Sequence, residues 1–156
     1  MQDDLKALSL LLAQAERQRD EALAEQLAAE RARRAAAAQA EQLVAYRREY
    51  EQRWGAEFCR DGKIELVRCY QGFIDRLTQA VEQQERVAAH AAVQAERAEA
   101  IVRGHELRAA GLKKLVERRL RQGEIAAARH AQRESDDRAV RGAWSRLTAP
   151  GDPTRL

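Results

Sequence analysis

The chain has 156 residues, of which 4% are aromatic and 34% charged, and its formal net charge is +3. So few large side chains exclude a thick globular core, because alanine supplies much of the apolar content. A chain rich in Ala, Glu, Leu, Gln and Arg is typical of long helices and coiled coils.

The N-terminal residues carry no predicted export signal. The short apolar run "LSLLLA" follows Asp3 and Asp4 and lacks a cleavage-site pattern. No window approaches the roughly 20 apolar residues that cross a membrane. Cys59 and Cys69 form no CxxC pair. We therefore expect a cytoplasmic protein with free thiols.

Two helical segments are predicted, the first from about residue 3 to 58 and the second from about 64 to 146. The motif "RDGK" interrupts them, and Asp-Gly is a strong turn signal, so a turn is expected at about 59–63. Two prolines and a glycine predict a disordered tail at 147–156. The expected fold class is all-α, a long antiparallel two-helix coiled-coil hairpin forming a single domain over 1–146.

The register of this hairpin follows from the position of the turn. If the turn is centred on Asp61 and Gly62, residues that face each other have numbers that sum to 123. Heptad steps from the turn then place Tyr50 opposite Phe73 and Leu8 opposite Leu115. The period near 3.5 predicts a left-handed coiled coil.

The second predicted helix is longer than the first, so an overhanging C-terminal helix is expected beyond about Arg118.

Charge is uneven along the chain. Residues 103–146 hold twelve Lys or Arg against six Asp or Glu, whereas residues 1–51 hold eight against ten. A basic segment suits an acidic partner surface, an anionic membrane or nucleic acid, although mixed charge on a helix is most often a solvated face.

Two stripes of residues stand out from the monotonous background, in "EQLVAYRREYEQRW" and "YQGFIDRLTQAVEQQ". Both have the spacing 4, 3, 4, which places each stripe on one side of a helix. They form the seam near the turn, an apolar ridge for another protein, or both, with Leu43 and Ala80 inward and Tyr46 and Phe73 at the rim. The eight residues are Gln39, Leu43, Tyr46, Tyr50, Phe73, Leu77, Ala80 and Gln84.

No catalytic or metal site is predicted. His90, His105 and His130 lie far apart, without a cysteine or carboxylate at the spacing of a ligand set or a catalytic triad. No glycine-rich phosphate loop is present. We expect a protein that is not an enzyme and that has no cofactor, metal or small-molecule substrate.

The two stripes, together with "LLAQAERQRDEAL" and "AQRESDDRAVR", resemble the FliJ family of flagellar type III export stalk proteins. The resemblance covers about residues 5–141. It implies a two-helix coiled coil, similar to the central stalk of rotary ATPases. It implies three partners: the flagellar export ATPase hexamer, whose ring assembly such proteins promote, the cytoplasmic domain of the membrane export gate, and export chaperones. It also implies peripheral association with the inner membrane at the flagellar base. The gate-binding residues implied are the eight of the two stripes.

Three other functions remain open at this stage. The equivalent stalk of a virulence injectisome shares the architecture. A self-associating structural coiled coil would form a stable oligomer when purified alone. A basic nucleic-acid binder is disfavoured, because few aromatic residues lie in the basic segment to stack on bases.

Overall fold

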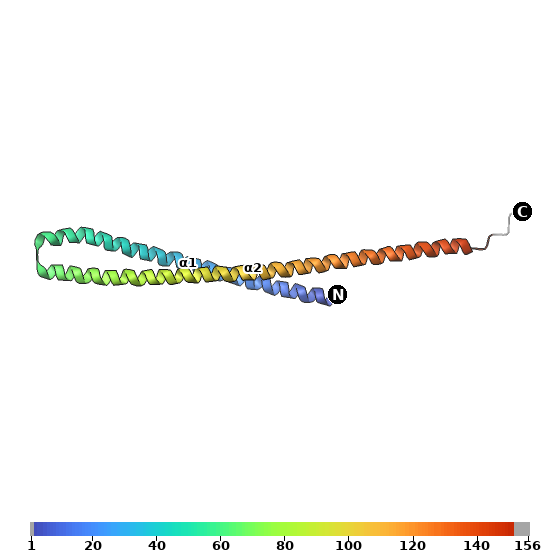
Figure 1. Ribbon diagram of the computed structural model, residues 1–156, viewed down its shortest axis with the longest axis horizontal. Coiled ribbons are helices and arrows are strands. Elements are labelled where there is room, and N and C mark those ends of the chain that lie inside the picture. Colours follow the sequence, from blue (N-terminus) through green and yellow to red (C-terminus); the bar gives the residue numbers. More distant parts are fainter. Residues whose placement is uncertain (1, 152–156) are drawn as a thin grey trace. The chain divides into compact units, whose positions relative to one another are not determined.

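The computed structural model describes residues 2–151, apart from the side chains of residues 58, 59 and 61. It contains two α-helices, α1 (Gln2–Asp61) and α2 (Ile64–Thr148), and no strand within the described residues (Figure 1). The predicted all-α fold with two long helices packed against each other is confirmed. α2 continues two residues beyond the expected end, and residues 152–156 of the expected tail lie outside the described residues.

Gly62 and Lys63 make the connection between the helices. Gly62 has φ of 56°, a left-handed conformation that a side chain disfavours. The carbonyl of Lys63 accepts a hydrogen bond from the N–H of Val67 at 3.2 Å, which begins α2. α1 extends through Asp61, so the reversal lies one residue later than the sequence analysis placed it.

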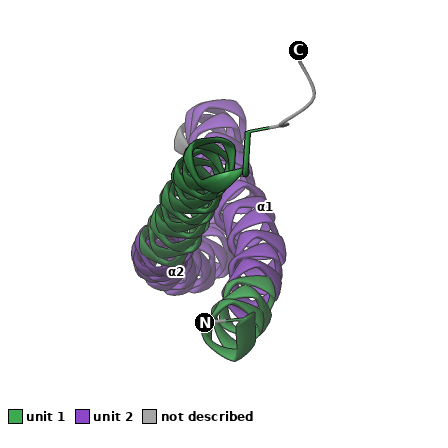
Figure 2. Cartoon of the chain, turned by 90° about the vertical axis from the view of Figure 1, so that its right-hand side faces the viewer, with its two compact units in different colours: residues 1–13, 110–156 green, residues 14–109 purple. Residues whose placement is uncertain are grey.

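The chain divides into two compact units, residues 14–109 and residues 1–13 with 110–156 (Figure 2). In the unit of residues 14–109, α1 and α2 run antiparallel on either side of the connection. The seam in this unit is thin, because its buried residues are mostly alanine. They are Ala15, Ala22, Ala36, Ala40, Leu77, Val81, Ala95, Val102 and Ala109.

The buried residues correct the predicted register. Ala15 and Ala109 have numbers that sum to 124, as do Ala22 and Val102. The expected sum of 123 pointed to Phe73, Val87 and Ile101 on α2, but these side chains are 36%, 43% and 52% exposed. The sum of 124 in place of 123 moves every seam position of α2 by one residue towards the C-terminus.

In the unit of residues 1–13 and 110–156, the first residues of α1 and part of α2 share an apolar contact zone. Leu5, Leu8 and Leu12 are half-buried there, and so are Leu112 and Val116. From Glu124 to Arg141 every residue of α2 is exposed.

Candidate docking surface

An aromatic cluster lies next to the connection, with Tyr50 at its centre. The Tyr50 ring centroid is 4.4 Å from that of Phe73 in a tilted arrangement, and 5.8 Å from that of Tyr70 in a stacked one. Tyr46 and Trp54 lie at 6.3 Å and 6.2 Å on the same helix as Tyr50. Aromatic pairs at these distances add about 0.5–1.5 kcal/mol each beyond their area burial, so the cluster fixes how the two helices meet.

Of the eight predicted docking residues, the structure places four at or near the seam and four on the surface. Leu77 is buried, and Leu43, Tyr50 and Gln84 are half-buried. The exposed four are Gln39, Tyr46, Phe73 and Ala80. Tyr46 and Phe73 lie at the rim as predicted, with exposures of 50% and 36%. Ala80 was expected to face inward and is instead exposed, because of the one-residue register difference.

A polar clasp joins the two stripes at the other end of this surface. The amide Nε2 of Gln84 donates to the backbone carbonyl of Ala36 at 3.3 Å and to Oε1 of Gln39 at 3.1 Å. A side-chain amide in a coiled-coil seam favours one register over its neighbours, because a slip breaks both bonds. The exposed Gln39 is thereby held in place by the seam.

Sequence reasoning missed Tyr70. It lies seven residues before Leu77 and fourteen before Gln84, which marks it as a seam position once the register is known. Its hydroxyl oxygen approaches Gly55, where a Cβ would lie 3.5 Å away. A small residue at that position leaves the Tyr70 ring its space beside α1.

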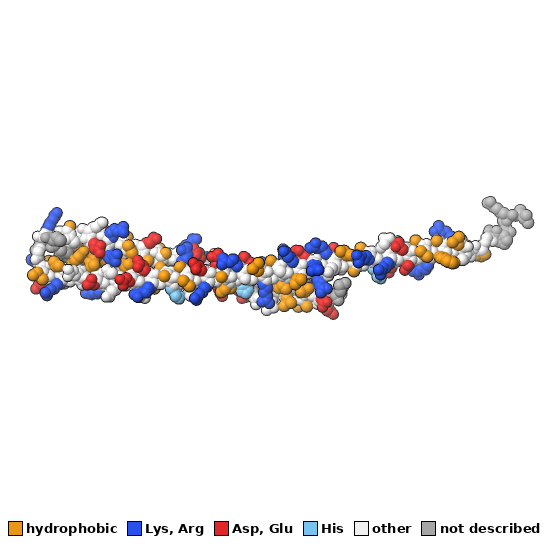
Figure 3. Space-filling model, viewed as in Figure 1, with side chains coloured by type: hydrophobic (Ala, Val, Ile, Leu, Met, Phe, Trp, Pro, Cys, Tyr) orange, Lys and Arg blue, Asp and Glu red, His pale blue; other side chains and the backbone are white. Residues whose placement is uncertain are grey.

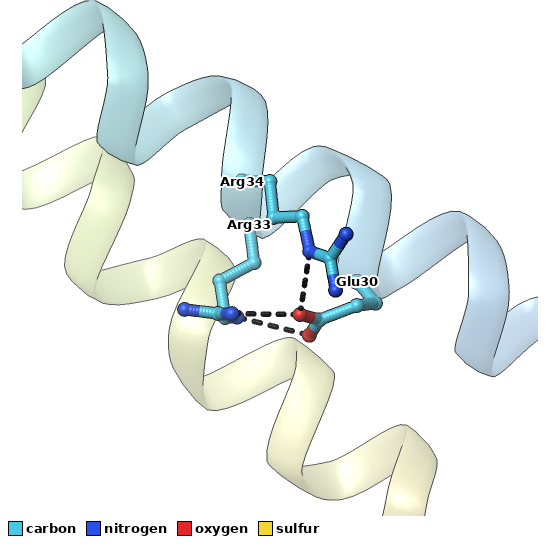
Figure 4. Close-up of polar contacts among 3 residues, drawn as sticks. All are labelled: Glu30, Arg33 and Arg34. Atoms are coloured by element: carbon cyan, nitrogen blue, oxygen red, sulfur yellow. Dashed lines mark hydrogen bonds and ion pairs between the residues drawn. The ribbon is translucent and has the colours of Figure 1, made fainter.

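A charged cluster lies in the same unit, away from the aromatic residues. Glu30 accepts hydrogen bonds from Arg33 Nη2 at 2.6 Å and Nε at 2.9 Å, and from Arg34 Nε at 3.1 Å (Figure 4). The hydrogen bonds from Arg33, aided by the one from Arg34, lower the pKa of Glu30 from 4.5 to about 2. The same bonds raise the pKa of Arg33. Arg33 occupies a seam position of α1, so Glu30 neutralises a cation that would otherwise be half-buried without a partner.

The described part of the chain offers neither a metal site nor a membrane span. No group of three or more His, Cys, Asp or Glu there is arranged to hold a metal ion. None of its helices is long and apolar enough to cross a membrane. Cys69 is a free, exposed thiol. A free thiol was also expected at Cys59, but the side chain of Cys59 is outside the part of the chain that the structure describes.

An antiparallel helical pair with an alanine seam and an exposed aromatic rim is a coiled-coil hairpin suited to binding other proteins. The family model described as Flagellar FliJ protein matches residues 5–148, so the chain belongs to the FliJ family. This confirms the resemblance seen in the sequence, and membership of the family implies the role of a stalk component in flagellar protein export. Searches of curated proteins and of solved structures gave no significant match.

Proposed function

We propose that this protein couples the flagellar export ATPase ring to the membrane export gate. In this role it binds the cytoplasmic domain of the gate, promotes assembly of the ATPase hexamer and assists export chaperones. It works at the flagellar base, held beside the inner membrane by these partners. The flagellar family model favours this role over that of an injectisome stalk.

The observation that carries the gate-binding proposal is the exposure of Tyr46 and Phe73 around a fixed centre. Both rings contact Tyr50, which the seam holds half-buried. Preorganised aromatic side chains lose little conformational entropy on binding, which is why they often dominate interface energies. The proposed gate surface consists of these two residues with Gln39 and Ala80, and Leu43, Tyr50, Leu77 and Gln84 support it from the seam.

For the ATPase we propose the other end of α2, as an overhanging helix. Its residues are exposed from Glu124 to Arg141, and the basic excess of residues 103–146 would complement an acidic ring lumen. No small set of contact residues is assigned there.

The test is a pull-down of the full chain with the gate's cytoplasmic domain and, separately, with the export ATPase. The test variant is Tyr46→Ala/Phe73→Ala. The control is Leu27→Ala/Val93→Ala, which removes two other exposed apolar side chains, 59% and 43% exposed. We expect the test variant alone to lose the gate while it keeps the ATPase and its helical circular dichroism.

Three results would count against the proposal. If the test variant keeps its gate binding, the surface is assigned wrongly. If the wild type binds neither partner, the coupling role fails. A stable oligomer of the purified wild type by sedimentation equilibrium would favour a self-associating structural coiled coil instead.

A further inference from the structure

The two long edges of the hairpin within residues 14–109 differ in character. Each helix of an antiparallel pair has two sets of positions that flank the seam. The positions just before every second seam residue lie on one edge, and the positions just after the seam residues in between lie on the other edge. Over residues 32–46 of α1 and 73–101 of α2 the first set has no charged residue, and this stretch is here named the apolar edge; beyond it the same positions hold Glu25, Arg53 and Arg108. The apolar edge consists of Ala32, Gln39 and Tyr46 of α1 with Phe73, Ala80, Val87, Gln94 and Ile101 of α2.

The second set, the charged edge, carries carboxylates on both helices. It consists of Glu30, Ala37, Val44 and Glu51 of α1 with Thr78, Glu85, Ala92 and Glu99 of α2. Glu30, Ala92 and Glu99 line one shared depression with Arg33, which shows that these positions of the two helices do meet. Hydrophobic side chains (orange) and carboxylates (red) are both visible along the hairpin in Figure 3.

The apolar edge adds more apolar positions than the packing of two helices requires. A two-stranded coiled coil uses two apolar positions in each heptad, whereas helices of a three-helix bundle use a third. Phe73, Val87 and Ile101 supply that third position on α2 at intervals of fourteen residues, with Ala80 midway between the first two. Their exposures of 36%, 43% and 52% show that the described chain leaves them uncovered.

The α1 side of this edge is also uncharged. From residue 28 to 46 it presents a row of exposed residues at spacings of four and three, namely Ala28, Ala32, Ala35, Gln39, Gln42 and Tyr46. Small side chains let the backbone of a third helix approach closely, and the larger Tyr46 and Phe73 lie at the end of this row nearest the connection.

Charge on the α2 side indicates the partner's chemistry. Arg76 and Arg97 are exposed on the outer flank of the apolar edge, with His90 between them in the same row. None of the ion pairs among the described residues involves either arginine. The α1 flank offers no charge between residues 28 and 46. A partner helix with acidic residues along one flank only would therefore bind the apolar edge in a single orientation.

We propose that the apolar edge binds an amphipathic helix of the export gate's cytoplasmic domain, with acidic residues on the flank that faces Arg76 and Arg97. This inference rests on the gate binding proposed above and extends that contact from Phe73 to Ile101. At 1.5 Å per residue this is about 42 Å along α2, or roughly 28 residues of partner helix.

Val87 and Val93 allow a matched test, because both are 43% exposed and Val93 lies off the apolar edge. The affinity of the full chain for the gate's cytoplasmic domain is measured by isothermal titration calorimetry. Val87→Glu is expected to raise Kd about tenfold or more, since it places a carboxylate in an apolar contact. Val93→Glu should leave Kd within about twofold. Circular dichroism melts check that each variant folds.

The charge and the helix are tested separately. Arg97→Glu should raise Kd several-fold and flatten its salt dependence, while Arg86→Glu on the outer face should not. Hydrogen exchange on the gate domain should show protection in one helical segment with acidic residues along one flank. Protection of an extended segment instead would overturn the inference.

The outcomes separate this inference from the gate binding on which it rests. If Tyr46→Ala/Phe73→Ala loses the gate but Val87→Glu binds as wild type does, gate binding stands and the extended helix contact is wrong. If the wild type does not bind the gate domain, both are wrong. A concentration-dependent dimer that Val87→Glu abolishes would assign the edge to a second copy of the chain and overturn the partner proposed here.

Discussion

The ring centroid of Tyr50 lies 4.4 Å from that of Phe73, and this contact joins the inside of the hairpin to its surface. Tyr50 is half-buried at the seam, whereas Phe73 is exposed at the rim. A change at Tyr50 therefore acts on the fold and on the docking surface together. A change at Tyr46, which is 50% exposed, acts mainly on the surface.

Tyr50→Ala should lower the free energy of unfolding by about 2 kcal/mol, because it removes the shared partner of Tyr46, Trp54, Tyr70 and Phe73 from a half-buried site. Tyr46→Ala should cost about 0.5 kcal/mol, since it removes one exposed ring. Urea denaturation followed by circular dichroism at 222 nm measures both. Equal losses for the two variants would mean that Tyr50 is not the centre of the cluster.

Gln84→Ala should lower the free energy of unfolding by about 1 kcal/mol, because the hydrogen bonds to Ala36 and Gln39 are lost. The neighbouring Gln83 is exposed, and Gln83→Ala should change stability by less than about 0.5 kcal/mol. The comparison again uses urea denaturation. A silent Gln84→Ala would show that the clasp contributes nothing to the register.

The ion cluster at Glu30 predicts a pH dependence. The pKa of Glu30 is lowered to about 2 in the folded chain from 4.5, so the folded state favours its ionised form. This contribution is complete above pH 4.5, declines as the pH falls below 4.5 and is lost below about 2. Glu30→Gln should therefore melt at a lower temperature than wild type at pH 7, and the gap should close as the pH falls to 2.

The carboxyl carbon of Glu30 gives a direct check on this pH dependence. Its ¹³C chemical shift in the folded protein should titrate with a midpoint near 2. A midpoint near 4.5 would contradict the hydrogen bonds drawn in Figure 4.

Two glycines make a matched pair for the connection. Gly62→Ala should lower the free energy of unfolding by about 1 kcal/mol, because φ of 56° disfavours a side chain. Gly104 lies inside α2 with nothing within 4 Å of an added Cβ, so Gly104→Ala should raise stability by about 1 kcal/mol. Thermal melts of both variants test the pair. Two changes of the same sign would count against the assigned turn.

The sequence was sufficient to predict both helices and the seam residues of α1, because a heptad pattern depends only on spacing along one helix. The prediction of which side of α2 meets α1 was wrong by one residue. The Asp-Gly motif marks a reversal, but it does not say whether Asp61 ends α1 or belongs to the turn. In the structure Asp61 is helical, and Val81, Ala95 and Val102 replace Ala80, Gln94 and Ile101 in the seam.

The candidate surface was predictable in part for the same reason. Tyr46 lies beside the seam in either register, so its place at the rim could be read from spacing alone, whereas Phe73 faces Tyr50 in the expected register and is exposed in the observed one. The exposure of Ala80 and the contacts of Tyr70 depend on how the two helices meet, which only the paired structure supplies. The contrast between the two edges likewise becomes visible only with the correct register.

The alanine seam also implies that the separation of the two helix axes varies along residues 14–109. The separation of two packed helix axes depends on the side chains between them. Methyl groups fill the α1 side at Ala15, Ala22 and Ala36, whereas the rings of Tyr50 and Tyr70 fill the layer near the connection. We therefore expect a wider cross-section at the aromatic layer than at the alanine layers, which would limit how far a ring-shaped partner that fits closely around the alanine layers could move along the hairpin.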